Sequence, residues 1–373
     1  MIDSGLLKPE ERAVFSLRAL YRQYGYTPYK MSKFEEYDLY VRNKDFLISD
    51  GIITFTDTAG KLLALKPDVT LSIIKNSKDV KGSVQKVYYD ENVYRISKGS
   101  HTYKEIMQTG LECVGDISEY DICEVVGLAL QSLSVLSEDF LLDISHAGLV
   151  FELLAALGVS GEKREELLAL IASKNGDETD ALVASGAISE KARELAVVLM
   201  GDYGDDSFVD ALTPYATTEA AKDMLEEFAS LYASLCALGY ENKINVDFSL
   251  INHMNYYSGV VFKGYVKGLP DSVLSGGRYD LLMRKMGRSS SAIGFAVYLD
   301  EIRRLHPKEE LPDADVLLIL DGSIKADVAF RAASRYSEGG KRVAVRSRIP
   351  ENFTYGRLVK IGKDGMEEES GDR

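Results

Sequence analysis

Helical and extended hydrophobic patterns alternate in the first part of the chain. Residues 9–24 carry apolar side chains at helical spacing, and Gly25 stands where such a helix would end. Two strand-like runs then flank the polar sequence TDTAGK (56–61), which is typical of a turn. Residues 120–137 follow as an apolar helix and residues 140–144 as a strand. The order predicts an antiparallel sheet with helices packed against it.

A long hairpin is predicted over residues 84–115. Arg95 ends its first strand, a polar loop follows, and the period of two in the second strand places Gln108, Gly110 and Glu112 on one face. An acid and an amide that share one face of an otherwise apolar strand favour a ligand-binding surface. A solvent-exposed sheet face is the alternative interpretation.

The hydrophobic pattern also suggests the domain organisation. Residues 158–240 are rich in Ala, Leu, Glu and Lys at helical spacing, which predicts a helical insertion. Strand-like patterns resume afterwards, so residues 1–157 and 241–306 are expected to form two parts of one domain. A charged, proline-bounded linker leads into residues 313–373, where a strand, helix and strand predict a small α/β unit with an acidic tail. We expect the final dozen residues to be disordered or nearly so.

Composition excludes several classes of protein. The chain has 373 residues, 46% of them hydrophobic, and 44 Lys and Arg against 58 Asp and Glu give a net charge of −14. This balance argues against nucleic acid as a partner, although a local basic groove stays possible. No segment has the continuous apolar length of a membrane span, and the N-terminus lacks a signal-peptide pattern. We therefore expect a globular protein with no membrane partner.

The cysteines and histidines indicate neither disulfides nor a metal site. Cys113, Cys123 and Cys236 are odd in number and lack CxxC spacing, and each lies in an apolar segment, so we expect buried free thiols and a cytoplasmic protein. The four histidines are scattered without the spacing of metal ligands. No metal or cofactor is expected.

Four segments, in this order, carry a family resemblance. They are LKPDVT (65–70), the hairpin (84–115), NYYSGVVF (255–262), and GGRYDLL followed by IGFAVYLDEI (276–302). Each is common by itself, but together they resemble histidyl-tRNA synthetases and the related regulatory subunits of ATP phosphoribosyltransferase. The resemblance implies an α+β fold, with a class II synthetase-like antiparallel sheet flanked by helices. It also implies that the C-terminal unit is a remnant of an anticodon-binding domain.

The same resemblance implies a histidine pocket. Glu112 and the Tyr257 hydroxyl would hold the two imidazole nitrogens, which offer donors or a donor and an acceptor. Asp68, Thr70 and Gln108 would meet the ammonium group of the ligand. Each of these residues taken alone could be an ordinary sheet or turn residue.

Three further residues complete the implied pocket. Tyr256 and Tyr279 would serve as walls. Arg95 has two open interpretations: it pairs with the carboxylate of a bound amino acid, or it forms a structural bridge to Glu112.

The chain departs from the synthetase pattern where ATP would bind. Asn252 and Glu301 occupy positions at which the synthetases have arginine, and Ser97 occupies the position of a glutamate. A carboxylate in place of a cation reverses the electrostatic stabilisation that adenylyl transfer requires. The resemblance therefore implies an amino-acid site whose capacity for adenylation is lost or severely reduced.

The function implied is that of a non-catalytic regulatory subunit. Such a subunit would self-associate as a dimer and pair with the short catalytic subunit of ATP phosphoribosyltransferase in a hetero-octamer. It would activate that subunit and contribute to feedback inhibition by histidine in the first step of histidine biosynthesis. The alternatives are a histidyl-tRNA synthetase with degenerate ATP motifs and a free-standing histidine-binding module.

Overall fold

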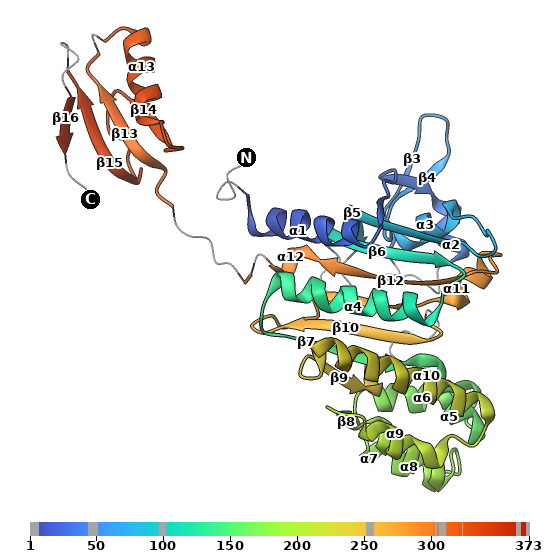
Figure 1. Cartoon of the computed structure of the whole chain (residues 1–373). Coiled ribbons are helices and arrows are strands. Elements are labelled where there is room, and N and C mark those ends of the chain that lie inside the picture. The colour runs from blue at the N-terminus through green and yellow to red at the C-terminus, as the bar shows by residue number, and fades with distance from the viewer. Residues whose placement is uncertain are drawn as a thin grey trace. The chain divides into compact units, whose positions relative to one another are not determined.

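The chain divides into two compact units, Met1–His306 and Pro307–Arg373, which are described separately (Figure 1). The computed structural model describes most of the chain. The described residues are 7–43, 51–96, 102–250, 257–302, 304–305, 311–322, 324–362 and, for the backbone only, 367–370.

A nine-stranded sheet is the centre of the first unit. Its strands are β1 (Thr27–Pro28), β5 (Val84–Ile96), β6 (Tyr103–Gly115), β7 (Phe140–His146), β8 (Asp202–Tyr203), β9 (Ile244–Asp247), β10 (Val260–Val266), β11 (Leu274–Arg278) and β12 (Ser291–Tyr298). Their order is β1-β5-β6-β12-β11-β10-β7-β9-β8. All neighbours are antiparallel except the pairs β1–β5 and β7–β9. The predicted hairpin is therefore confirmed as β5 and β6, near one edge of the sheet.

Two long helices, α1 (Pro9–Gln23) and α4 (Glu119–Leu136), cover one face of this sheet (Figure 1). Leu17 and Tyr21 of α1 are fully buried in the same hydrophobic core as Leu111 and Phe295 of the sheet. Helix α1 ends at Gln23, and Tyr24 is its C-cap. Gly25 follows with a φ of +83°, a conformation that favours glycine. The helix and its end are confirmed as predicted.

Six α-helices lie between β7 and β9 along the chain, and the short strand β8 comes between the fourth and the fifth of them. They are α5 (Ala147–Ala156), α6 (Gly161–Ala172), α7 (Asp177–Ala184), α8 (Glu190–Leu199), α9 (Ser207–Leu212) and α10 (Glu219–Leu235). The rings of Phe208, Phe228 and Phe248 pack with centroids 5.2 to 6.3 Å apart. These rings belong to the same hydrophobic core as the sheet, so the helices are packed into the first unit.

The other face of the sheet is covered near β5 and β6 by smaller elements. These are α2 (Tyr37–Arg42), α3 (Thr70–Asn76), α11 (Asp280–Lys285) and a three-stranded sheet of β2 (Phe34–Glu36), β4 (Leu62–Leu65) and β3 (Thr54–Thr56). The predicted turn connects β3 and β4, because the Asp57 carboxylate accepts hydrogen bonds from the N–H groups of Ala59 and Lys61 at 2.9 and 2.8 Å. A second hydrophobic core lies here.

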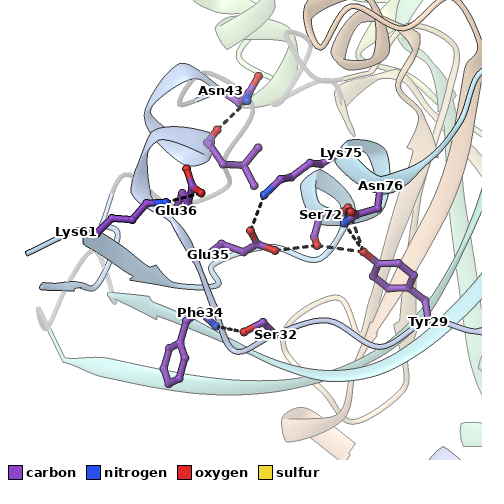
Figure 2. Close-up of polar contacts among 11 residues, drawn as sticks. Tyr29, Ser32, Phe34, Glu35, Glu36, Asn43, Lys61, Ser72, Lys75 and Asn76 are labelled. Atoms are coloured by element: carbon purple, nitrogen blue, oxygen red, sulfur yellow. Dashed lines mark hydrogen bonds and ion pairs between the residues drawn. The ribbon is translucent and has the colours of Figure 1, made fainter. Parts of the chain in front are cut away.

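A polar network fixes helix α3 in this layer (Figure 2). Glu35 of β2 accepts hydrogen bonds from Lys75 Nζ at 2.9 Å and Ser72 Oγ at 3.3 Å. The Tyr29 hydroxyl donates to the Ser72 carbonyl at 3.1 Å. Thr70 is the first residue of α3, so the network positions one of the predicted pocket residues.

In its described residues, the second unit is a four-stranded sheet with one helix. Its elements are β13 (Ala314–Leu320), α13 (Ala326–Tyr336), β14 (Val343–Arg346), β15 (Tyr355–Ile361) and β16 (Glu367–Ser370). The strand order is β14-β13-β15-β16, and β16 is antiparallel to β15. The predicted strand, helix and strand are confirmed, and β15 was not anticipated from the sequence.

Two expectations need correction. The acidic tail was expected to be disordered, but residues 367–370 form a strand, because the edge of β15 offers backbone groups that pair whatever the side chains are. All three cysteines are free thiols, yet Cys123 and Cys236 are only half-buried, and Cys113 alone is fully buried. None of the helices in the described ranges is both long and apolar enough to cross a membrane.

Candidate functional site

The Glu112 carboxylate is the centre of a buried polar cluster. Thr70 Oγ1 donates a hydrogen bond to Glu112 Oε1 at 2.6 Å, and the Tyr279 hydroxyl donates to Oε2. Burial raises the pKa of Glu112 to about 8, although both hydrogen bonds act in the opposite direction. Each carboxylate oxygen can accept more than one hydrogen bond, so a ligand donor could still be bound. A cationic donor would favour the ionised form.

Two glycines make room for the side chains of the predicted pocket. A Cβ at Gly294 would collide with Glu112 Oε2, and a Cβ at Gly277 would lie 2.7 Å from the Tyr257 ring. Gly294 pairs with Glu112 in β6 and with Gly277 in β11, so the carboxylate and the phenol lie over adjoining glycines. Neither glycine was predicted to have a role from its sequence neighbours. The signal was present in the small residues of GGRYD and IGFAV, but it required the strand register.

The segment that carries Asp68 and Thr70 is anchored by a buried ion pair. Lys66 is 1% exposed, and its Nζ donates to the Glu91 carboxylate of β5. The Asp68 carboxylate accepts from the Leu71 N–H at 2.9 Å, which holds the first turn of α3. Burial raises the pKa of Asp68, and the Leu71 N–H opposes this shift. The Lys66–Glu91 pair was missed from the sequence because its partners are distant along the chain.

Arg95 also supports this segment. Its Nε donates to the Pro67 carbonyl at 2.9 Å. Of its two predicted roles, the bridge to Glu112 does not occur among the described residues, where Glu112 is bound by Thr70 and Tyr279 instead. The pairing of Arg95 with a carboxylate ligand, which would use its terminal guanidinium nitrogens, stays a prediction.

Three of the four remaining predicted pocket residues lie within the described residues. Gln108 is buried in β6 on the same face as Glu112. Tyr257 packs on Gly277, and burial raises the pKa of its hydroxyl. Tyr279, expected as a wall, is hydrogen-bonded to Glu112 directly. Tyr256 lies outside the described residues, so its predicted role as a wall stays a prediction.

One of the three positions at which the chain departs from the synthetase pattern lies within the described residues. Glu301 lies in the short helix α12 (Leu299–Ile302), where Arg304 Nη1 pairs with its carboxylate at 2.6 Å. The acid at this position is therefore held by a neighbouring cation within the chain. Ser97 and Asn252 lie outside the described residues.

The polar cluster around Glu112 has the groups needed to bind a small polar ligand. Glu112 offers a carboxylate in a buried setting, and Tyr257 offers a hydroxyl on the same face of the sheet. Asp68 and Gln108 add oxygen acceptors, and Arg95 adds a cation. Acceptors, a cation and aromatic walls are the groups that bind an amino acid with a polar side chain.

The mostly antiparallel sheet with helices on its faces is a class II synthetase-like α+β fold, as predicted. The model of a family described as histidyl-tRNA synthetase matches residues 7–302. The chain belongs to the histidyl-tRNA synthetase family.

Curated relatives are similar over most of their length. A protein of Oceanobacillus iheyensis named ATP phosphoribosyltransferase regulatory subunit is 29% identical over 330 residues, which is 87% of this chain and 81% of the relative. A protein of Clostridium acetobutylicum with the same name is 26% identical over 93% of this chain and 88% of its own.

Solved structures support the fold. A structure from Bacillus halodurans, described as an ATP phosphoribosyltransferase regulatory subunit/histidyl-tRNA synthetase, is similar with a TM-score of 0.76 and 24% identity, over 94% of this chain and 93% of that one. Histidyl-tRNA synthetase from Nostoc sp. PCC 7120 has a TM-score of 0.71 and 17% identity over 100% and 96%. A chain of the ATP phosphoribosyl transferase (HisG:HisZ) complex from Thermotoga maritima has a TM-score of 0.61 and 22% identity over 77% and 96%.

Proposed function

We propose that the chain is the regulatory subunit of ATP phosphoribosyltransferase and has no catalytic activity of its own. The observation that carries this proposal is the similarity to relatives of that name over more than four-fifths of their length. The similarity to a chain of the HisG:HisZ complex agrees with it. The protein would act in the cytoplasm, as a dimer within a hetero-octamer that also contains the short catalytic subunit.

The buried cluster would be the histidine site of this subunit. The Glu112 carboxylate and the Tyr257 hydroxyl would bind the imidazole nitrogens, and Asp68 with Gln108 would bind the ammonium group. Arg95 would bind the ligand carboxylate through its terminal nitrogens, since its Nε is already used by Pro67. The tight packing of Glu112 against Gly294 supports a preformed site rather than an exposed sheet face.

Regulation would follow from thermodynamic linkage. If histidine binds two states of the complex with different affinity, its binding shifts the population toward the state it prefers. The network of Figure 2 joins Ser72 and Lys75 of α3 to Glu35 of the three-stranded sheet, and Thr70 is the first residue of the same helix. A displacement of Thr70 on ligand binding would therefore act on this layer. Such a connection supports a role in communication between the pocket and a neighbouring subunit.

The test is an assay of phosphoribosyl-ATP formation by the purified short catalytic subunit from the same organism. Adding this chain should increase the rate, and adding histidine should then reduce it. A catalytic subunit whose rate and histidine response are the same with and without the chain would contradict the proposal. A titration monitored by light scattering would show in the same samples whether a complex forms.

One alternative has support in the structure and requires its own control. The family and the fold are those of histidyl-tRNA synthetases, so histidine-dependent exchange of pyrophosphate into ATP should be measured with the purified chain. We expect no exchange, because Glu301 places a carboxylate where the synthetases have arginine. Robust exchange would favour an active synthetase. Histidine binding without any complex or exchange would favour a free-standing binding module.

A further inference from the structure

Small residues line the strands beside the candidate pocket until one large side chain interrupts them. On β12 the positions that face the pocket are Gly294, Ala296 and then Tyr298, and on β11 they are Gly277 and Ser275. Directly paired residues of antiparallel strands project from the same face, so these five positions form one surface. Tyr298 is the large residue at one end of it.

Tyr298 is fixed in place beside Gln108. The two residues are paired in the β6–β12 register, and the Tyr298 hydroxyl lies 2.7 Å from Ser275 Oγ on the next strand. The ring is half-buried and therefore occupies space on the pocket side of the sheet.

The direction of a bound amino acid follows from the proposed contacts. Its imidazole would lie at Glu112 and Tyr257, and its ammonium and carboxylate would lie toward Gln108. Any group attached to that carboxylate must extend past Gln108, alongside Tyr298.

The length of a ligand can be compared with the distance between Gly294 and Tyr298 along β12. Gly294, which pairs with Glu112, and Tyr298 are four positions apart. A strand rises about 3.3 Å per residue, so the surface between them is roughly 13 Å long. Histidine spans roughly half of this from imidazole to carboxylate, given bond lengths near 1.5 Å. An amino acid joined to a nucleotide carries a phosphate, a ribose and a purine in addition. These groups add roughly 10 Å, given bond lengths near 1.5 Å, so the whole ligand would be longer than this surface.

We infer that Tyr298, held by Ser275, closes the pocket at its Gln108 end, so that the site accepts a free amino acid and excludes an aminoacyl nucleotide. This inference rests on the proposed histidine site. It assigns to Tyr298 a role in specificity, since its ring selects the ligand by length. It is independent of Glu301, because exclusion here is steric and would hold even if a cation replaced that acid.

The test compares two ligands by calorimetry with the full chain. The ligands are histidine and histidyl sulfamoyl adenosine, a stable mimic of the aminoacyl nucleotide. The wild-type chain should bind histidine and bind the mimic at least about tenfold more weakly, because forcing extra atoms into a packed site is unfavourable. Tyr298→Ala should improve the affinity for the mimic about tenfold or more relative to histidine.

Two further variants separate the ring from its hydroxyl and from general effects. Tyr298→Phe keeps the ring and should keep most of the exclusion. Tyr265→Ala removes a half-buried tyrosine from β10, outside the proposed contacts, and should leave the ratio of the two affinities unchanged.

The outcomes separate the inference from the function beneath it. A wild-type chain that binds histidine and binds the mimic equally well or more tightly would overturn the role of Tyr298 alone. A wild-type chain that binds neither ligand would overturn the histidine site, and the inference with it. The wild-type comparison decides the matter even if Tyr298→Ala fails to fold.

Discussion

The hydroxyl of Tyr279 donates a hydrogen bond to the Glu112 carboxylate, although the two residues are 167 positions apart in the chain. Thr70, which precedes Glu112 by 42 positions in the sequence, donates to the other oxygen of the same carboxylate. The acid is thus held by two segments that come together only in the folded sheet. It is oriented before any ligand arrives, which reduces the cost of ordering the site on binding.

Removing this carboxylate should weaken ligand binding. Glu112→Ala is expected to reduce histidine affinity by about 1.5–3 kcal/mol, because a charge-assisted hydrogen bond is lost. Isothermal titration calorimetry measures the change directly. Glu105→Ala, an exposed acid on the same strand, is the matched control and should bind histidine like the wild-type chain. Unchanged affinity in Glu112→Ala would place the ligand elsewhere.

The stability of the ligand-free chain should depend on pH through Glu112. Its folded pKa of about 8 lies above the ordinary value of 4.5, so between these values the folded state holds a proton that the unfolded state has released. Stability should therefore fall as pH rises, by up to about 1.4 kcal/mol per pH unit, and level off above pH 8. Glu112→Gln should flatten this dependence.

The pH window for that experiment is set by His146. Burial lowers the pKa of His146 to about 4, so this group makes stability rise with pH between about 4 and 6.5 and adds nothing above. Urea unfolding from pH 6.5 to 8 isolates Glu112 from this opposite effect. Equal slopes for the wild-type chain and Glu112→Gln in that window would show that the acid is already ionised.

The buried ion pair of Lys66 and Glu91 should matter for stability. Lys66→Met leaves a mostly buried carboxylate without its cation and should cost about 3–5 kcal/mol in the free energy of unfolding. The double change with Glu91→Leu should recover much of this loss. Lys61→Met removes the cation of an exposed pair with Glu36, shown in Figure 2, and should change the unfolding midpoint little. Chemical denaturation compares the three variants.

Gly294 should tolerate no side chain. A Cβ there would collide with the Glu112 carboxylate, so Gly294→Ala is expected to abolish detectable histidine binding in calorimetry. Gly127→Ala is the control, because a Cβ at Gly127 in helix α4 meets no atom within 4 Å and alanine favours a helix. Full binding by Gly294→Ala would mean that Glu112 can move aside at little cost.

Local patterns predicted the elements of the fold well. The helix before Gly25 and the turn at Asp57 could be read from spacing and turn residues, because both are determined by neighbours in sequence. Strand β16 could not be predicted from local pattern, because its acidic composition is typical of disorder and its stability comes from pairing with β15. Composition describes what a segment could bury and does not describe which strand edge it will meet.

The residues of the candidate site were predicted from the sequence, but the contacts between them were not. The resemblance supplied Glu112, Thr70 and Tyr279, but their mutual hydrogen bonds depend on how β6, α3 and α11 are placed. The glycine at position 294 and the large residue at 298 acquired roles only through the register of β12 with β6. Long-range pairing is the information that a single sequence does not contain.

The central claim is that a pocket on this chain senses histidine for a catalytic partner. The most direct measurement is a histidine titration of phosphoribosyl-ATP formation by the complex, with wild-type or Glu112→Ala chain. The account predicts that Glu112→Ala still activates the catalytic subunit and that inhibition requires at least about tenfold more histidine, which corresponds to about 1.4 kcal/mol. Identical inhibition curves for the two complexes would contradict it.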